Sequence, residues 1–567
     1  MNRYRTQWGI ALLAILFFVP FLGGVHLFDW DEINFAEIAR EMVVSGDYLR
    51  PQMDFTFFTE KPPMFMWFQA LSMNIFGIGE FASRLPNAIA GIITLLLLYR
   101  FGKKIYNHRF GLIWVAAYFG SILPHLYFRS GIIDPWFNLF IFLGIYHLIL
   151  FHWKKEDQKG MDLKRSKWFY LIIAAGFTGL AILVKGPVAL LITLITLGTY
   201  WLYAKLRFYI NVLELGVYLL FVLITSGLWF AIVTLLYGSQ FIIEFTIRQW
   251  ELFANQDAGH GGFIGYHFVV LLIGCFPASI FMLRSMGKLS LDTSAQKDMR
   301  RWMLMLFWVV LILFTIVNTK IVHYSSLAYF PLTYLAAVVI DQLMEKKIRL
   351  RSWLSIGILG IAIPFGIAIT VLPWIMMNPE LIKPLFSADP FAMANLDANV
   401  NWTGWESIAG LILIGIGLGG VFYIRREEWK KMLIVLFGGG GVFVFITLIF
   451  FIARIEKISQ NAAIEFYESK KECNCYVQPL AYKSYGHFFY SEIPMEQNPL
   501  HRDVQWLKSG AIDKDVYFIT KITNSDNLEQ LEDVEKLYEK NGFVFWERKM
   551  MTEDRRPKTE FQINSDW

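Results

Sequence analysis

The chain has 567 residues, of which 56% are hydrophobic and only 17% are charged, and its formal net charge is +5. A soluble protein of this length could not bury so much apolar surface, so the composition excludes an ordinary soluble enzyme. The small net charge gives no indication of nucleic-acid binding. Long uncharged stretches recur along most of the chain, each near the roughly 20 residues that cross a bilayer as a helix. Because lipid offers the backbone no hydrogen bonds, these stretches are predicted to be helices.

About thirteen membrane spans are predicted from these stretches. In chain order they lie near residues 7–28, 83–101, 109–128, 134–152, 168–185, 187–204, 211–237, 263–284, 301–318, 321–341, 353–375, 404–424 and 431–452. The first lacks a small-residue cleavage site, so we predict an uncleaved span. Lys and Arg gather in alternate loops. By the positive-inside rule those loops and the N-terminus are cytoplasmic, and the C-terminal segment is outside.

The loop after the first span, residues 29–82, is long and too polar to cross a membrane. Apolar residues recur with helical spacing over 35–43 and stop at Gly46, and a second helix is predicted over 62–76. Both helices are amphipathic and are predicted to lie at the membrane surface.

Carboxylates stand at the start of the first of these helices. Asp31 and Glu32 follow the first span directly, at the depth where water meets lipid. Carboxylates in such a place can bind a metal ion or accept a proton from a hydroxyl group. The alternative is that both residues simply complement the dipole of the helix that they begin.

The motif Glu60-Lys61-Pro62-Pro63 is more specific. Proline is favoured at the first position of a helix, so Lys61 is predicted to stand just before a helix N-terminus. Free backbone N–H groups and an ammonium group then face the same volume, which suits a phosphate. The alternative is a surface lysine that extends toward lipid headgroups.

The same combination of charge and proline occurs twice more. Asp134-Pro135 opens the fourth predicted span, and Lys185-Gly186-Pro187 breaks the chain between the fifth and the sixth. Helix capping is a sufficient alternative for Asp134. Lys185 has apolar residues on both sides, and such a charge is costly unless it is paired or faces water.

Further polar residues lie on the predicted outer side. Arg248 suits a bidentate contact with phosphate, or it pairs with Glu244 one helical turn earlier. His260 and His323 are candidate metal ligands, although single histidines more often only form hydrogen bonds. The predicted topology places all these groups on one side of the membrane, where a substrate with a polar head and a lipid tail would arrive.

The C-terminal segment, residues 453–567, differs in composition from the spans. It is polar and is predicted to be a small α/β domain outside the membrane, following a transmembrane domain over 1–452. Strand-like runs lie at 475–477, 515–520 and 542–547. Helical spacing of apolar residues predicts a helix within 524–541. Cys473 and Cys475 are close in sequence and are predicted to be free thiols.

Several motifs of the first loop resemble one family. They are the run from Asp31 to Asp47, Glu60-Lys61-Pro62-Pro63, and the run from Phe81 to Pro86. Together they resemble the first outer loop of the aminoarabinose transferases that modify lipid A, within the GT-C superfamily of polyprenyl-phosphate-sugar glycosyltransferases. Lys185-Gly186-Pro187 and the run from Lys320 to Tyr324 fit later motifs of that family. The resemblance covers most of residues 1–345, although Phe35 stands where the family often has Tyr.

The resemblance implies a mostly α, GT-C-like helical bundle in a bacterial inner membrane, with a periplasmic C-terminal domain. It also implies an inverting transfer of a sugar (a pentose such as aminoarabinose, or a hexose) from undecaprenyl phosphate to a lipid A-like lipid or a glycan. By motif position, Asp31 and Asp134 are implied as catalytic residues, and Lys61 and Lys185 as ligands of the donor phosphate. The family's arginine after the seventh span does not align cleanly, and Arg248 is the nearest candidate for it as a further phosphate ligand. Glu32, Glu60, His260 and His323 are assigned to the acceptor or metal region. No cofactor is assigned, and a divalent cation stays open.

Two other functional classes stay open. A transporter or flippase would need ionisable groups near the bilayer midplane and, often, repeated halves, but the sequence has no repeat and its charges lie at one edge. A scaffold whose outer domain binds a partner would give Lys61, Asp134 and Lys185 no reason to share one side. The sequence therefore favours a glycosyltransferase that binds membrane lipids and a lipid-linked sugar.

Overall fold

A computed structural model describes residues 2–157, 161–206, 209–254 and 261–550. The chain divides into two compact units. Unit 1 comprises Met1–Leu27, Ile38–Trp374 and Trp402–Ala453, and unit 2 comprises Phe28–Glu37, Ile375–Asn401 and Arg454–Trp567. Each unit is described by itself.

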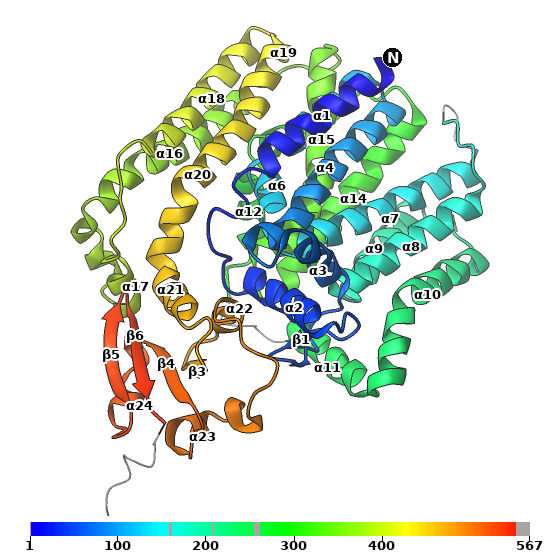
Figure 1. The fold of residues 1–567 in the computed structure, drawn as a ribbon. Coiled ribbons are helices and arrows are strands. Elements are labelled where there is room, and N and C mark those ends of the chain that lie inside the picture. The colour runs from blue at the N-terminus through cyan, green and yellow to red at the C-terminus, as the bar shows by residue number, and fades with distance from the viewer. Residues whose placement is uncertain (1, 158–160, 207–208, 255–260, 551–567) are drawn as a thin grey trace, which may run out of the picture. The chain divides into compact units, whose positions relative to one another are not determined.

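Unit 1 is a bundle of helices (Figure 1). Its first half contains α1 (Asn2–Phe18), β1 (Gln52–Met53), β2 (Thr56–Phe57), α3 (Met64–Phe76), α4 (Glu80–Ile105), α5 (His108–Phe119), α6 (Ile122–Leu126), η1 (Tyr127–Arg129), α7 (Asp134–Lys155), α8 (Lys167–Lys185), α9 (Val188–Tyr203), α10 (Val212–Tyr237) and α11 (Gln240–Ala254). Its second half contains α12 (Tyr266–Gly274), α13 (Ala278–Ser285), α14 (Ser294–Ile316), η2 (Val322–Ala328), α15 (Tyr329–Met344), α16 (Ser352–Met376), α18 (Ser407–Arg425), α19 (Trp429–Met432), η5 (Leu433–Gly438) and α20 (Gly439–Ser459).

Among the described residues, nine helices are long and apolar enough to cross a membrane, or up to eleven if each of two bent pairs is one span. The bent pairs are α5 with α6 and η1, at 83°, and α12 with α13, at 116°. Two shorter apolar helices, Tyr4–Phe18 and Val188–Tyr203, occupy the remaining predicted stretches. The prediction of a mostly helical multi-pass protein is therefore confirmed.

The interior of the bundle is built on α7 and α15, whose side chains are buried along nearly the whole of each helix. A helix that is apolar on all sides belongs inside such a bundle. At the end of α7, Lys155 contacts the buried carboxylate of Glu214 at 2.7 Å, and Lys167 contacts its other oxygen at 2.9 Å. Glu214 also closes a capping box with Asn211 at the start of α10. These contacts join α7, α8 and α10.

The two helices predicted in the first loop are present. The first, α2 (Asp31–Ser45), ends before Gly46 at φ +72°, and α3 ends before Gly77 at φ +86°. Such positive φ values favour glycine, which explains why both helices stop there. In α2 the polar residues Glu37, Arg40 and Glu41 are buried along with its apolar face.

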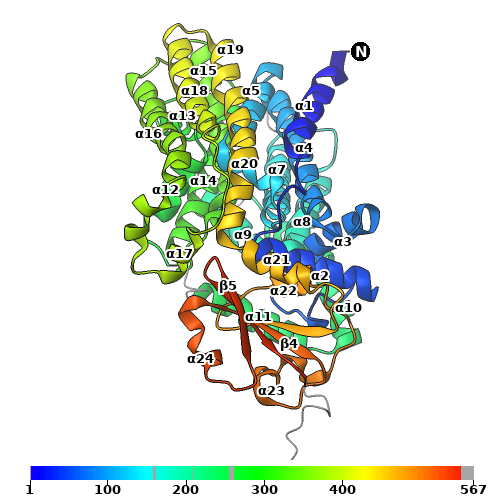
Figure 2. The same cartoon turned by 60° about the vertical axis from the view of Figure 1, so that its left-hand side comes forward.

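Unit 2 contains a four-stranded sheet (Figure 2). The strand order is β3 (Cys475–Pro479), β4 (Asp515–Lys521), β6 (Phe543–Arg548) and β5 (Glu535–Lys540). The pair β3–β4 is parallel and the other two pairs are antiparallel. Short helices accompany the sheet: η3 (Pro379–Leu381), η4 (Lys383–Phe386), α17 (Pro390–Asn395), α21 (Asn461–Ser469), α22 (Gly486–Tyr490), η6 (Pro499–Arg502), α23 (Val504–Ser509), η7 (Ile522–Asn524) and α24 (Asp526–Glu529). The core of the unit includes Phe518, Val544 and Trp546.

Two predictions for this segment were wrong. The three predicted strands are present, but the predicted helix within 524–541 is limited to α24, and residues 535–540 form the edge strand β5. Backbone pairing with β6 overrides the helical spacing of the apolar residues. Cys473 and Cys475 are disulfide-bonded, with Cα atoms 5.3 Å apart, a separation that a disulfide can bridge.

Candidate active site

An ion pair joins two of the predicted site residues in unit 1. Asp134 is the first residue of α7 and Lys185 is the last residue of α8. Because consecutive antiparallel helices bring the start of one beside the end of the next, the two side chains meet. The Lys185 Nζ donates to Asp134 Oδ1 at 2.7 Å, and the two side chains are 15% and 3% exposed. The N-cap residue of α7 is Ile133, so Asp134 is not at the capping position that sequence offered as its alternative.

His323 and two aromatic rings complete the surroundings of this pair. The His323 Nε2 lies 3.9 Å from Asp134 Oδ2. The Lys185 Nζ lies 5.4 Å from the ring centre of Phe137 and 5.2 Å from that of Tyr324. The ammonium group is thus held between a carboxylate and two aromatic faces. Phe137, three residues after Asp134 on α7, was not predicted.

The second oxygen of Asp134, Oδ2, is buried and faces His323. It is not hydrogen-bonded within the described residues. Buried carboxylate oxygens are normally hydrogen-bonded, so one without such a bond next to a cation is a place for a group from a ligand.

Neighbouring amides brace the backbone around this cluster. Asn87 on α4 donates to the carbonyls of Ser130 and Ile132, both at 2.6 Å, and so fixes the turn before Asp134. Asn138, one turn further along α7, donates to Ser326 Oγ at 2.7 Å and ties α7 to η2, which carries His323. The site therefore stands on rigid elements, which suits accurate placement of reacting groups.

A second cluster surrounds Glu60. The Arg248 Nε lies 3.6 Å from Glu60 Oε1, and Arg248 Nη1 lies 3.6 Å from Glu251 Oε2. Glu244, which sequence offered as a partner of Arg248, instead accepts a hydrogen bond from Gln240 at 2.6 Å. Arg248 on α11 is thus connected to the loop that carries Glu60 and Lys61.

Gln249 on α11 contacts both lysine-bearing segments. Its Nε2 donates to the Glu60 carbonyl at 3.4 Å. Its Oε1 lies 3.0 Å from the point where a Cβ on Gly186 would stand, and Gly186 has φ +124°. The loop before α3 and the break after Lys185 therefore meet the same side chain. Sequence reasoning missed Gln249, whose only signal was its position next to Arg248.

The remaining predicted residues are placed as follows. Lys61 is partly exposed and stands three residues before α3 begins at Met64. Asp31 is the first residue of α2 and Glu32 the second, both in unit 2. The Glu32 Oε2 accepts a hydrogen bond from the Phe28 N–H, which lies before the helix, at 3.0 Å. His260 lies outside the described residues.

Lys320, in the last of the family-like motifs, has a structural contact. Its Nζ donates to the carbonyls of Phe314 at 3.2 Å, Thr315 at 2.7 Å and Val317 at 2.5 Å. These carbonyls belong to the end of α14, where a cation satisfies acceptors that the helix leaves open. The ammonium group of Lys320 thus caps the C-terminus of α14.

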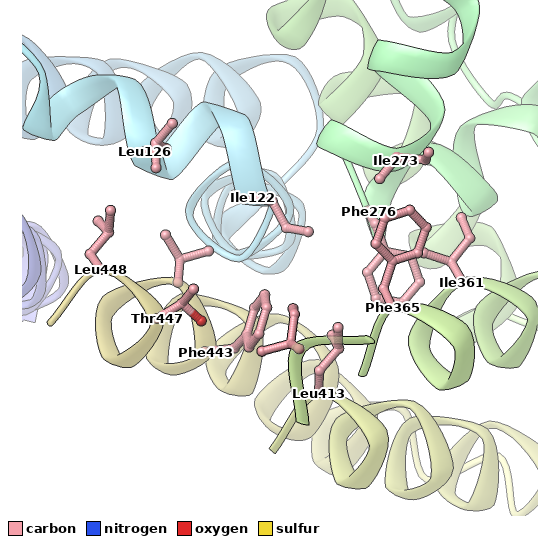
Figure 3. Close-up of a pocket in the computed structure, with 12 residues that line it drawn as sticks. Ile122, Leu126, Ile273, Phe276, Ile361, Phe365, Leu413, Phe443, Thr447 and Leu448 are labelled. Atoms are coloured by element: carbon pink, nitrogen blue, oxygen red, sulfur yellow. The ribbon is translucent and has the colours of Figure 1, made fainter. Parts of the chain in front are cut away.

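The described ranges contain no group of three or more His, Cys, Asp or Glu side chains that could hold a metal ion. They do contain an apolar cavity of about 250 Å³ in unit 1 (Figure 3). It is lined by Ile122, Leu126, Ile273, Phe276, Ile361, Phe365, Ile369, Leu413, Phe443, Val444, Thr447 and Leu448. None of these residues comes from the first loop. The lining suits a hydrocarbon chain.

Comparisons with known proteins agree with this architecture. The family model of dolichyl-phosphate-mannose-protein mannosyltransferases matches residues 60–230, which include Glu60, Asp134 and Lys185. The chain is 25% identical over 428 residues to the undecaprenyl phosphate-alpha-4-amino-4-deoxy-L-arabinose arabinosyl transferase of Pectobacterium carotovorum, covering 73% of this chain and 72% of the relative. It is 27% identical over 433 residues to the enzyme of the same name from Pectobacterium atrosepticum, with the same coverages.

Solved structures show the same fold. The crystal structure of ArnT from Cupriavidus metallidurans bound to undecaprenyl phosphate matches with a TM-score of 0.75 and 17% identity, over 96% of this chain and 98% of that one. The apo form of that protein matches with a TM-score of 0.71 and 16% identity over the same shares. The bundle and the small sheet of this chain thus have counterparts in one known fold. The chain is thus similar in sequence to aminoarabinose transferases over about three quarters of its length, and it has the fold of ArnT.

Proposed function

We propose that the chain transfers a sugar from undecaprenyl phosphate to a hydroxyl group of a lipid A-like lipid or a glycan. The observation that supports the proposal is the cluster of Asp134, Lys185 and His323. In it, a nearly buried ammonium group contacts one carboxylate oxygen, and the other oxygen has no hydrogen-bond partner among the described residues. The curated relatives bear the name of enzymes that use an undecaprenyl-phosphate aminosugar, which supports that donor for this chain.

The cations of the site act on the donor phosphate. Lys185 is already held in place by Asp134 and two rings, so it stabilises negative charge on a leaving phosphate without being reoriented. Lys61 lies in the loop before α3 and Arg248 lies on α11. The contacts of Gln249 and Arg248 with Glu60 hold these two segments together, so Lys61 and Arg248 supply further positive charge. Stabilisation of a charge that grows during the reaction lowers its barrier.

The chemistry is a single displacement. The acceptor hydroxyl oxygen attacks the anomeric carbon of the sugar and forms the new glycosidic bond. The bond between that carbon and the phosphate oxygen breaks, and undecaprenyl phosphate leaves with the electron pair. The hydroxyl proton passes to a carboxylate, a role that motif position assigns to Asp31. One displacement inverts the anomeric configuration.

The proposal includes an orientation. The lysine- and arginine-rich loops favour a cytoplasmic N-terminus and a periplasmic C-terminal segment in a bacterial inner membrane. Single cysteines at residues 61 and 185 in a cysteine-free protein would both react with an impermeant thiol reagent added from outside. Labelling of residue 61 from one face and residue 185 from the other would contradict this orientation and with it the shared site.

The function itself is tested by transfer from a radiolabelled undecaprenyl-phosphate sugar in membranes. We expect Asp31→Asn and Lys185→Met to lose nearly all transfer. Lys347→Met is the matched control, because Lys347 also pairs with carboxylates, Asp292 at 2.5 Å and Glu345 at 2.8 Å, but in a loop predicted to be cytoplasmic. Wild-type turnover by Lys185→Met, or an absence of transfer by the wild-type protein with every donor of this class, would end the proposal.

A further inference from the structure

The C-terminal segment grips the two residues that precede Asp31. The Asp29 N–H donates to Gln460 Oε1 at 3.2 Å, and Asp29 Oδ1 accepts from the Tyr485 N–H at 3.2 Å. The Trp30 Nε1 donates to the Lys483 carbonyl at 2.7 Å. All these residues belong to unit 2, although more than 400 positions separate the two sets in sequence. We name Gln460, Lys483, Ser484 and Tyr485 the Asp29 clamp.

Asp29 is held in a setting that disfavours a free carboxylate. Its removal from water raises the pKa of the Asp29 carboxyl to about 6, while the Ser484 side chain, the Tyr485 N–H and the charge of Lys483 each act to lower the pKa. The Lys483 Nζ also lies 5.2 Å from the ring centre of Trp30. Because a buried carboxylate costs stability, a carboxylate kept there with dedicated partners indicates a specific structural demand.

The clamp rests on a rigid base. The hydroxyl groups of Tyr467 on α21 and Tyr482 lie 2.9 Å apart, and Tyr467 is 1% exposed. Gly486 begins α22 directly after the clamp, and a Cβ there would stand 3.0 Å from the Tyr467 ring. Packing of this kind leaves the clamp little freedom to move.

Backbone hydrogen bonds connect the residues held by the Asp29 clamp to the first turn of α2, which begins at Asp31. The Asn34 N–H donates to the Trp30 carbonyl at 2.9 Å, which makes Trp30 the acceptor of the first turn of α2. The Phe28 N–H donates to Glu32 Oε2 at 3.0 Å across the same turn. The positions of Asp29 and Trp30 therefore determine where α2 starts and how its first residue, Asp31, is oriented.

We propose that Asp29 is a positioning residue and that the C-terminal segment serves the transfer reaction by fixing Asp31 through the Asp29 clamp. This inference rests on the proposed function and assigns the C-terminal segment a part in positioning Asp31. Displacement of a reacting group by about 1 Å can reduce a rate by about 10²-fold, so an anchor of this kind has a large effect on turnover.

The test uses the full-length protein in membranes and separates kcat from KM for the donor. We expect Asp29→Ala to reduce kcat by about 10²-fold with little change in KM, since the donor-phosphate ligands are untouched. Asp29→Asn keeps an oxygen for the Tyr485 N–H and should recover much of the loss. The matched control is Asp513→Asn, because Asp513 accepts from Tyr476 at 2.9 Å and from Asn498 at 3.2 Å in the same unit. It should transfer at the wild-type rate.

A second variant covers the case in which Asp29→Ala does not fold. Trp30→Phe removes the donor to the Lys483 carbonyl but keeps an aromatic ring, and we expect a several-fold fall in kcat with an unchanged melting temperature. If Trp30→Phe and Asp29→Asn both keep wild-type kcat and KM, the clamp has no positioning role. That result differs from failure of the proposed function, in which the wild-type protein itself would not transfer sugar.

Discussion

Asp134 and Asp29 are both carboxylates held near a lysine, but they reach their partners by different routes. Asp134 meets Lys185 because α7 and α8 are consecutive antiparallel helices. Asp29 meets Tyr485 because the chain returns after more than 400 residues. The first contact follows from local sequence order, and the second depends on how a whole segment folds. A sequence motif therefore cannot predict a long-range contact such as that of Asp29, even though Asp29 lies next to the motif that begins at Asp31.

The largest expected effect tests the nature of the Asp134 contact. Lys185→Met leaves the nearly buried Asp134 carboxylate without its cation, which should cost about 3–5 kcal/mol of unfolding free energy. The double variant Lys185→Met with Asp134→Asn should recover most of that stability but no transfer. Thermal unfolding in detergent measures the first effect and the labelled-donor assay the second. Equal melting temperatures for the single variant and the wild-type protein would show that the pair is not buried.

The second prediction concerns the pH dependence of the Asp29 contact. The pKa of Asp29 is raised from 3.8 to about 6 by burial, so the folded state binds more protons than the unfolded state between these values. Stability should therefore rise as the pH falls from 7 to 4, by at most about 3 kcal/mol. The comparison is the melting temperature of wild-type protein against Asp29→Asn over this range. Parallel curves for the two proteins would rule out the buried carboxyl.

The third prediction concerns the break beside Lys185. Gly186 has φ +124°, where an L side chain is strained, and a Cβ there would crowd Gln249. Gly186→Ala should therefore cost about 1–3 kcal/mol. Adding Gln249→Ala should relieve only the crowding, so the double variant should remain less stable than Gln249→Ala alone. Full recovery in the double variant would mean that the backbone conformation carries no cost.

The smallest effect is expected for an exposed ion pair, which serves as a comparison for the nearly buried pair of Lys185 and Asp134. The Lys540 Nζ lies 2.5 Å from Glu465 Oε2, but the two side chains are 46% and 48% exposed. Lys540→Ala should change the unfolding free energy by no more than about 1 kcal/mol, since water and salt screen such pairs. A loss as large as that of Lys185→Met would show that burial does not decide the strength of ion pairs in this chain.

Hydropathy predicted most of the fold because crossing a membrane is a local property of about 20 residues. The predicted stretches all contain helices, and the strands β3, β4 and β6 lie where apolar runs predicted them. The strand β5 could not be predicted in this way, because its apolar residues fit a helix and only pairing with β6 makes it a strand. Secondary structure that depends on a distant partner is not encoded in local spacing.

Some residues of the candidate site also carry a signal that can be read from the local sequence. Glu60, Asp134 and Lys185 could be selected because charged residues beside apolar spans and prolines are rare and costly. Gln249 and Tyr485 carry no such signal, since an uncharged amide and a backbone N–H look ordinary in sequence. Lys320 is also a conspicuous charge in sequence, but in the structure it hydrogen-bonds the carbonyls at the C-terminal end of α14.

The edge strand β5 has a consequence for how the molecule behaves among its own copies. All six of its residues are exposed, and four of them are charged: Glu535, Lys536, Glu539 and Lys540. An unpaired strand edge is a template on which a strand from another molecule can add, and charged side chains oppose that addition. The charged edge strand β5 therefore disfavours edge-to-edge association between copies of the protein, which are concentrated in the plane of the membrane.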